Sequence, residues 1–195
     1  MTSPSPRRIR TLKRIQASAI RLALAEGLNN ITTESIARDA GISTRTFFNH
    51  YPYKEAAIMG PPPDYPADAT ERFVSGRGRL IDDLNLLIAA HLRRFVDDRE
   101  MIANMLRLSE TDAKLQALRK NAVLARRAQL NQMLQRRMPH VRPVMAEILA
   151  SAIIAATNNA TDEWAFGRRE DFIELARENL ELILPSVALL NAPPD

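Results

Sequence analysis

The sequence contains no cysteine, few glycines and few aromatic residues, and each shortage narrows the classes of protein to which it can belong. Without cysteine, the 195-residue chain has no disulfide, no zinc–cysteine site and no thiol nucleophile, which agrees with a cytoplasmic location. Six glycines and an aromatic content of 5% argue against a large sheet, which needs turn glycines and β-branched or aromatic strand residues. We therefore expect an all-α fold.

Long apolar runs and clusters of metal ligands are also missing. No apolar stretch approaches the roughly 18 residues of a membrane span, so we expect no membrane partner. His91 and His140 stand apart from other ligand-type residues, so we expect neither a metal site nor a cofactor. The sequence also lacks a Gly-x-Ser-x-Gly elbow, a phosphate-binding glycine loop and a His-Glu-x-x-His pair, which argues against an enzyme.

The positive charge is concentrated at the N-terminal end. The formal net charge is +4, and residues 1–55 hold nine basic and four acidic side chains, so the rest of the chain is nearly neutral. A surplus confined to one part of a chain favours a polyanion as the partner of that part.

Apolar periodicity, capping residues and helix-ending glycines divide the chain into helices. The expected helices cover about residues 7–26, 32–40, 44–49, 52–59, 80–96, 100–108, 112–138, 144–164 and 170–184. The stretch "GPPPDYP" cannot lie inside a helix. We therefore expect a disordered tail at 1–6, an N-terminal domain at 7–60, a proline-rich linker at 61–76 and a helical C-terminal domain at 77–190.

Two short helices joined by "AGIS" predict a helix-turn-helix. Gly41 supplies the positive φ that a tight turn between helices needs, and Ser43 and Thr32 are good N-caps for the two helices. Phe47 is expected on the inner face of the second helix. The outer face of that helix can then enter a DNA major groove.

The outer face carries side chains that hydrogen-bond to bases and phosphates. Arg45 can pair with guanine and Asn49 with adenine, and Thr46 can offer a methyl to thymine or a hydroxyl to phosphate. Lys54, at the beginning of the next helix, is placed for a phosphate. No carboxylate occurs in residues 40–54, as a surface facing phosphates requires.

The stretch "ITTESIARDAGISTRTFFNHYPYKEAAI", residues 31–58, resembles the TetR family of transcriptional regulators. The family pattern has a capping Thr, then Ile-Ala, Ala-Gly-Val/Ile-Ser, a Thr with two aromatics, a His/Tyr-Phe pair and Lys-Glu. Ile15, Ala19, Leu22 and Gly27 stand where the family's first helix has its core residues and cap. The resemblance covers about residues 10–60 and implies a homodimer whose all-helical second domain binds a small effector.

The resemblance also implies DNA-binding roles for particular residues. Residues 44–46 would face the groove, and His50 and Lys54 would contact backbone phosphate. Phe48 departs from the pattern, because a tyrosine whose hydroxyl reaches phosphate is common there. Without the hydroxyl, Phe48 would only pack against a DNA sugar or against the core. Thr32 or Thr33 would cap the second helix and touch phosphate. The candidate DNA-binding residues are Thr32, Thr33, Ser43, Thr44, Arg45, Thr46, Phe48, Asn49, His50 and Lys54.

Two C-terminal helices are apolar enough to predict a subunit interface. The helix expected after Pro143 has almost no polar face, and such a helix is covered on both sides. The last helix has one wide apolar stripe. We expect both to form a four-helix bundle with a second copy, and purely intramolecular packing is the alternative. The expected interface residues are Ile148, Ala152, Ile153, Ala156, Phe172, Leu180, Ile183 and Leu184.

Arginines interrupt an apolar stripe of the 112–138 helix. At about 100° per residue, Arg119, Arg126 and Arg137 share one face with apolar side chains, so they need partners. One interpretation is ion pairs with Asp82, Asp83 or C-terminal glutamates, or stems that extend to water.

The other interpretation is that these arginines hold an anionic effector, such as a carboxylate or a phosphate-bearing acyl compound. Aromatic side chains further along the chain can line such a pocket. The candidate effector-pocket residues are Arg119, Arg126, Met133 and Trp164.

The sequence as a whole predicts a transcriptional repressor and not an enzyme. We expect a cytoplasmic homodimer that binds a palindromic double-stranded DNA operator and is released by a small-molecule effector. A helical interaction module without DNA binding and an unrecognised small-molecule-binding enzyme are the alternatives.

Overall fold

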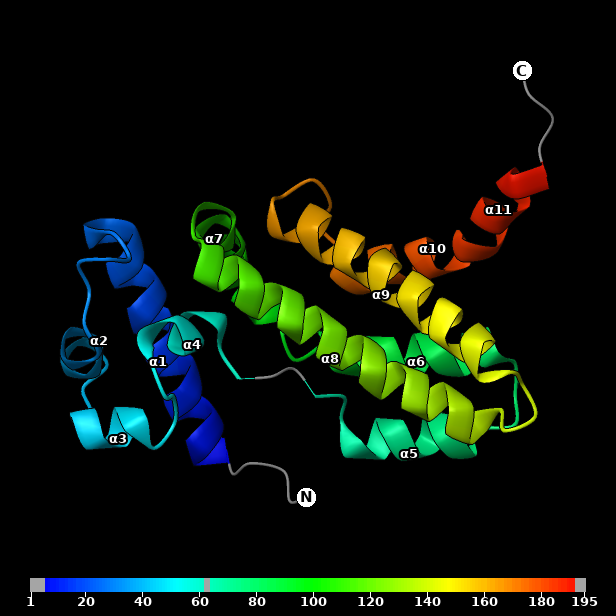
Figure 1. Ribbon diagram of the computed structural model, residues 1–195, viewed down its shortest axis with the longest axis horizontal. Coiled ribbons are helices and arrows are strands. Elements are labelled where there is room, and N and C mark those ends of the chain that lie inside the picture. Colours follow the sequence, from blue (N-terminus) through cyan, green and yellow to red (C-terminus); the bar gives the residue numbers. More distant parts are fainter. Residues whose placement is uncertain (1–5, 62–63, 192–195) are drawn as a thin grey trace. The chain divides into compact units, whose positions relative to one another are not determined.

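Figure 1 shows a computed structural model of the chain, which describes residues 6–61 and 64–191. All regular elements in these residues are helices, which confirms the predicted fold class. The chain divides into two compact units, unit 1 (Met1–Pro63 and Glu100–Ala122) and unit 2 (Asp64–Arg99 and Val123–Asp195). The tail predicted at residues 1–6 lies outside the described residues, except that the first helix begins at Pro6.

Unit 1 combines the N-terminal helices with a segment expected in the C-terminal domain. Its elements are α1 (Pro6–Glu26), α2 (Thr33–Asp39), α3 (Thr44–Phe48), α4 (Lys54–Met59), nearly all of α7 (Arg99–Thr111) and the first part of α8 (Ala113–Arg137). One apolar core joins them, and its fully buried members include Ile15, Ile36, Phe47, Ile58 and Leu115. Helices of five to seven residues such as α2, α3 and α4 are unstable alone, so they depend on this core.

Gln16 and Gly60 join the end of α4 to α1. The buried Gln16 amide donates a hydrogen bond of 3.1 Å to the Ile58 carbonyl oxygen. Gly60 ends α4 with φ +75°, and a Cβ at this position would lie 2.5 Å from Gln16 Nε2. Glycine therefore permits both the left-handed backbone and the close approach of the amide.

Unit 2 is a second set of packed helices. Its elements are α5 (Ala67–Ser75), α6 (Leu80–Leu92), η1 (Val96–Asp98), the remainder of α8, α9 (Pro143–Ala165), α10 (Phe172–Glu181), α11 (Ile183–Ala188) and η2 (Leu189–Asn191). Helices α9 and α10 lie side by side in Figure 1, and α10 also packs on α6. No helix in the described residues has the length and hydropathy to cross a membrane.

Several helix boundaries differ from the sequence-based expectation, and three of them change the description of the fold. Helix α4 begins at Lys54 and not at Pro52, because Tyr53 is extended with φ −162° and ψ 167°. Helix α6 ends at Leu92, four residues before the predicted Val96. The last predicted helix is divided at Leu182 into α10 and α11.

The segment predicted as a linker, residues 61–76, contains a helix. The nine residues of α5 follow the last proline, Pro66, which stands at the N-cap position. They form a helix because Ala69 and Phe73, four residues apart on one face, are 4% and 1% exposed. The prolines therefore end before the helix begins, and burial of its apolar face stabilises it.

Arg137 forms an ion pair with Asp83, which was one of the two interpretations that the sequence allowed for this arginine. Its guanidinium contacts Asp83 Oδ2 at 2.6 Å, and its side chain is only 5% exposed. It also donates to the carbonyl oxygens of Phe73 and Gly78 and lies over the Phe73 ring. These contacts satisfy the buried charge, so Arg137 links α8 to α5 and α6.

His91 is a buried histidine between two aromatic rings of unit 2. The centres of the Tyr65 and Phe95 rings lie 4.8 and 5.4 Å from that of His91. Burial first, and then the charges of Arg126 and Arg94, lower the pKa of His91 from 6.5 to about 3. The imidazole is therefore neutral in the folded protein at pH 7.

We predict that His91 makes the protein less stable in mild acid. The unfolded chain binds a proton near pH 6.5 and the folded chain only near pH 3, so stability decreases as the pH falls below about 6.5. Between pH 7 and pH 5 this linkage removes roughly 2 kcal/mol. Urea unfolding of wild type and His91→Phe at both pH values measures the effect, and the variant should lose roughly 2 kcal/mol less. Equal losses in the two proteins would contradict the prediction.

Candidate nucleic-acid interface

Helix α2 begins with the cap predicted for it. The Thr32 hydroxyl accepts a hydrogen bond of 3.1 Å from the Ser35 backbone N–H, and the Ser35 hydroxyl accepts one of 3.0 Å from the Thr32 N–H. This reciprocal pair satisfies two N–H groups that would otherwise lack a partner. Thr33 is not the cap, because its hydroxyl donates to the Glu34 carboxylate.

The turn between α2 and α3 has the predicted geometry. Gly41 has φ +63°, and the Ile42 N–H donates to the Ala37 carbonyl oxygen at 2.9 Å. Ser43 caps α3, since its hydroxyl accepts a hydrogen bond of 3.1 Å from the Thr46 N–H. These contacts lie within six residues of one another, so a local sequence pattern was sufficient to predict them.

The two faces of α3 differ in burial as predicted. Phe47 is fully buried, whereas Arg45 and Asn49 are exposed and Thr44 and Thr46 are half-buried. The Thr46 hydroxyl lies 2.9 Å from that of Ser43, so the cap also orients this side chain. The exposed face therefore presents a guanidinium, an amide and two threonines.

Phe48 lies on the surface of α3 and not in the core. Its side chain is 52% exposed, and its ring meets the edge of Phe47 with 5.5 Å between centres. Of the two roles open to a phenylalanine here, core packing is excluded by this exposure. Contact with a DNA sugar stays a prediction.

His50 lies at the C-terminal end of α3 as a half-buried, neutral side chain. Burial and, to a smaller degree, the charge of Arg8 lower the pKa of His50. Its Nδ1 atom is buried without a hydrogen-bond partner in the described residues. The predicted phosphate contact of His50 would therefore be a hydrogen bond from an uncharged imidazole.

Lys54 has an intramolecular role that the sequence did not reveal. Its ammonium donates hydrogen bonds of 2.7 and 3.0 Å to the carbonyl oxygens of Leu28 and Ile31. These contacts hold the start of α4 against the turn between α1 and α2. The partners are 26 and 23 residues away in the chain, so no local pattern indicates them. These two hydrogen bonds leave one ammonium N–H of Lys54 for the predicted phosphate contact.

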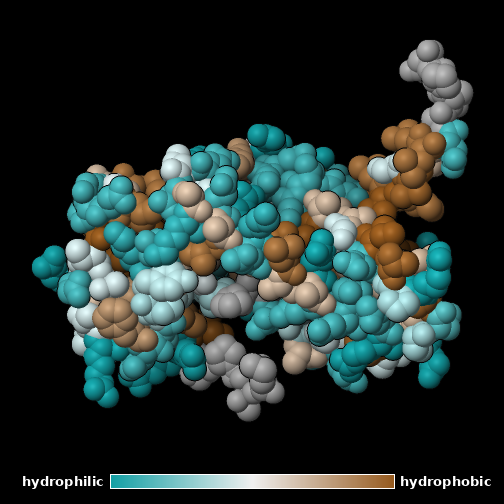
Figure 2. Space-filling model, viewed as in Figure 1, coloured by the Kyte–Doolittle hydropathy of each residue, from teal (hydrophilic) through white to brown (hydrophobic). Residues whose placement is uncertain are grey.

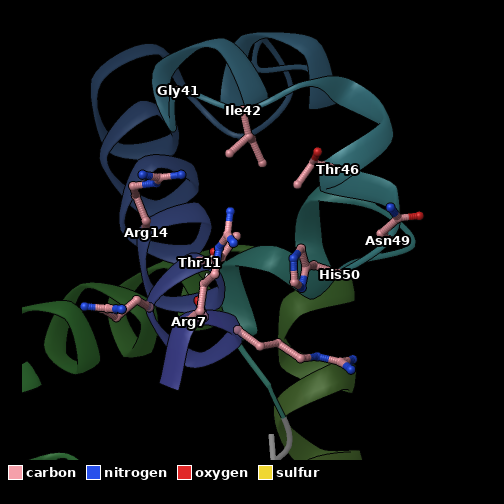
Figure 3. Close-up of a pocket in the computed structure, with 10 residues that line it drawn as sticks. Arg7, Thr11, Arg14, Gly41, Ile42, Thr46, Asn49 and His50 are labelled. Carbon is pink, nitrogen blue, oxygen red and sulfur yellow. Dashed lines mark hydrogen bonds between the residues drawn. The ribbon is translucent and has the colours of Figure 1, made fainter. Parts of the chain in front are cut away.

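A groove between α1 and α3 adds residues that were not among the candidates. It has a volume of about 1000 Å³. Figure 3 shows Arg7, Thr11 and Arg14 of α1 on one side, and Thr46 of α3 with His50 of the following turn on the other. From the sequence alone, the arginines of α1 counted only toward the net charge of residues 1–55, with no individual role assigned to them. Their i, i+3 and i+7 spacing, which includes Arg10, places them on one face of a helix.

The eight predicted interface residues fall into two groups in unit 2. Ile153, Phe172 and Leu180 are 0%, 4% and 2% exposed within their own chain. For these three the prediction is wrong, because helices α9 and α10 already cover them and leave no surface for a partner. The other five, which have exposed or half-buried side chains, are Ile148, Ala152, Ala156, Ile183 and Leu184.

The four candidate effector-pocket residues are not gathered at one described site. Arg119 belongs to unit 1 and the other three to unit 2. Met133 is 5% exposed. Trp164 is stacked on Phe172 with 4.2 Å between ring centres, beside a depression of about 370 Å³ that Glu170 and Asp171 also line. Acidic side chains there do not suit an anion.

Arg126 is the candidate with a polar environment suited to an anion. Its Nη2 group donates a hydrogen bond of 2.8 Å to Asn158 Oδ1 of α9. Its charge, together with that of Arg94, acts on the buried and neutral His91. Two arginine charges therefore act on the same buried part of unit 2.

The comparisons with known proteins agree with this geometry. The family model for bacterial regulatory proteins of the tetR family matches residues 15–56, the segment that contains the helix-turn-helix. No curated protein matches the chain. Residues 15–56, which contain the helix-turn-helix, are thus similar to the N-terminal domain of that family.

Solved structures show the same fold along nearly the whole chain. Thermus thermophilus FadR in complex with lauroyl-CoA, a TetR-family transcriptional repressor, is 23% identical, with a TM-score of 0.59 over 94% of this chain and 98% of that one. FadR from Bacillus halodurans is 15% identical (TM-score 0.58; 94% and 97%). Bacillus subtilis FadR in complex with stearoyl-CoA is 16% identical (TM-score 0.54; 87% and 96%).

Proposed function

We propose that the protein is a repressor that binds a palindromic operator in the cytoplasm as a homodimer and leaves it when an anionic effector binds. The observation that carries this proposal is the outer surface of α3, with α1 beside it. This surface is basic and rich in hydrogen-bonding groups, and no carboxylate lines the groove between the two helices in the described residues. Such a surface fits double-stranded DNA.

The proposed base contacts follow from the exposed side chains of α3. Arg45 is exposed and can donate two hydrogen bonds to guanine, and Asn49 can both donate to and accept from adenine. Thr44 and Thr46 can contact a thymine methyl or a phosphate. A homodimer would present two such helices about 34 Å apart, which matches one turn of DNA and a palindromic site.

Exposed apolar side chains of unit 2 support the proposed dimer. On α9, Val144, Met145 and Ile148 are 52%, 50% and 65% exposed. Around α11, Leu182, Leu184, Val187, Leu189 and Leu190 are 54–84% exposed, and Figure 2 shows hydrophobic side chains in brown over this helix. An apolar surface of this kind is typical of a subunit interface, and a second copy would cover it in a four-helix arrangement of α9 and the segment of α10 and α11.

The proposed effector is an acyl compound with a negatively charged group. The charges of Arg126 and Arg94 act on one buried part of unit 2, and Asn158 already binds the Arg126 guanidinium. An anionic group would form charge-assisted hydrogen bonds there. Two proteins of the same fold are in complex with lauroyl-CoA and stearoyl-CoA, which makes acyl-CoA the first class to test.

The proposed mechanism of release is a change in the spacing of the two recognition helices. Effector binding would favour a conformation in which both helices cannot seat in the major groove together. DNA affinity would then decrease through differential binding of the effector to the two states. Repression would result from an operator that overlaps the site of the polymerase.

We predict that Arg45 reads one base pair in each half-site. The operator is first recovered by selecting bound duplexes from a random library with the wild-type protein. Arg45→Gln should then bind the operator with roughly 5- to 150-fold lower affinity per half-site, as expected for loss of one bidentate base contact in each. Repeated selection with the variant should relax the preference at one position of each half-site. Arg38→Gln, an exposed arginine of α2, is the control, and an unaltered preference in Arg45→Gln would refute the assignment.

We also predict that the exposed face of α9 holds the dimer together. Ile148→Asp places a charge on the 65%-exposed Ile148 position and should convert the protein to a monomer in sedimentation velocity. Leu86→Asp, at a 67%-exposed leucine of α6, should leave the dimer intact. A dimer that persists in Ile148→Asp at low micromolar concentration would argue against this interface.

For the effector, we predict that Arg126 is needed for ligand response. Lauroyl-CoA should raise the thermal midpoint of the wild-type protein and release the operator in a mobility-shift assay. Arg126→Leu should weaken lauroyl-CoA binding roughly 10- to 100-fold, because a charge-assisted hydrogen bond contributes about 1.5–3 kcal/mol. Arg127→Leu, the next residue of α8, is the matched control. Equal responses of the two variants would exclude Arg126 from the site.

A further inference from the structure

The groove between α1 and α3 contains a row of arginines that the proposed base contacts do not use. Arg7, Arg10 and Arg14 are exposed residues of α1 that line it, and Arg8 lines it as well. Their positions, three, four and seven residues apart, form one stripe along the helix. Thr46 of α3, with Asn49 and His50 directly after that helix, lines the opposite wall, and Figure 3 shows the open space between the two sides.

Arg21, further along α1, differs from this row in having an acidic partner. Arg21 continues the same face of α1 but forms an ion pair with Asp39 of α2, and this hydrogen bond lowers the pKa of Asp39. No acidic side chain lines the groove in the described part of the chain. Like charges on one stripe repel one another weakly, and an anionic partner would relieve this repulsion.

The dimensions of the row fit a nucleic-acid strand. Seven residues of α-helix, from Arg7 to Arg14, span about 10 Å. One strand of B-DNA carries a phosphate about every 3.4 Å of helix axis, and its phosphates are further apart along the inclined strand itself, so the row covers about two phosphates. A groove of about 1000 Å³ has room for a sugar–phosphate segment, and the exposed face of α3 adjoins it.

We propose that the groove binds one sugar–phosphate strand of the operator, with Arg7, Arg10 and Arg14 on one side of the strand and Thr46 and His50 on the other. The inference rests on DNA binding by α3 and adds a second contact beside the major groove. The arginines neutralise phosphates and position the strand. They therefore contribute affinity for every DNA sequence, whereas Arg45 contributes preference for one.

The neutral state of His50 fits this arrangement. Its imidazole would contribute a hydrogen bond to the strand, and the arginines would contribute the charge. Protonation of His50 would place a further positive charge beside the row, and the lowered pKa of His50 opposes this. The contribution of the groove to DNA affinity should therefore decrease strongly with salt concentration. It should also decrease when arginines are removed from the groove.

The test compares the salt dependence of DNA binding in the full-length protein and in Arg10→Gln/Arg14→Gln. The probes are the selected operator and an unrelated duplex of equal length, in 50 to 200 mM KCl. Loss of two phosphate contacts should lower the slope of log K against log [salt] by about 1.8 per protomer. Over this salt range the wild-type protein should then lose about ten-fold more affinity per protomer than the variant. Affinity for both duplexes should decrease by the same factor.

Two further variants separate contact from general charge. Arg72→Gln/Arg79→Gln removes the same two charges from exposed positions of unit 2 and should keep the wild-type slope. Arg10→Lys/Arg14→Lys preserves the charge in the groove and should also keep it. Circular dichroism melting of each variant verifies that α1 is intact.

Three outcomes would overturn the inference. They are an unchanged slope in Arg10→Gln/Arg14→Gln, an equal decrease in the unit 2 control, and a loss of affinity confined to the operator, which would make the arginines base-reading residues. A wild-type protein that binds neither duplex would overturn DNA binding itself, and this result is distinct from a failure of the groove alone.

Discussion

Burial of the Phe47 ring is the contact on which the DNA-binding surface depends. Helix α3 has only five residues, which is far too short to be stable alone. Its fully buried Phe47 side chain anchors it to the core shared with α1, α2 and α4, and the Ser43 cap sets where it begins. With these two ends held, Arg45 and Asn49 can only point outward. The functional surface is thus a consequence of how one apolar side chain is packed.

Three groups of arginines in the described residues have different environments, and we assign each a different role. Arg137 is buried against Asp83 and backbone carbonyl oxygens, so its role is structural. Arg126 binds Asn158 where a second arginine charge also acts and is our candidate for the effector. Arg10 and Arg14 line a groove without acidic residues in the described chain. Because a guanidinium is always charged, its partner and its burial decide what it does.

Much of the helix-turn-helix was predictable because its determinants are close together in the chain. The Thr32 cap, the Gly41 turn and the Ser43 cap all act over two to five residues, and they occur as expected. Burial of Phe47 followed from apolar periodicity. Residues that act through distant partners were not predictable in this way. Lys54 and Gln16 bond to carbonyl oxygens 23–42 residues away, and nothing near them in the sequence specifies those partners.

By itself, the sequence determined the all-α class, the position of the DNA-binding motif and the side chains that α3 exposes, because helix caps, turns and 3.6-residue periodicity are local properties. Only the tertiary structure decided that Ile153, Phe172 and Leu180 are core and that Ile148 and Leu184 are surface. The same holds for the arginine row of α1, which faces α3 across a groove. An apolar or charged stripe has the same sequence pattern whether it is buried or exposed. Only the packing of distant elements determines what lies against it.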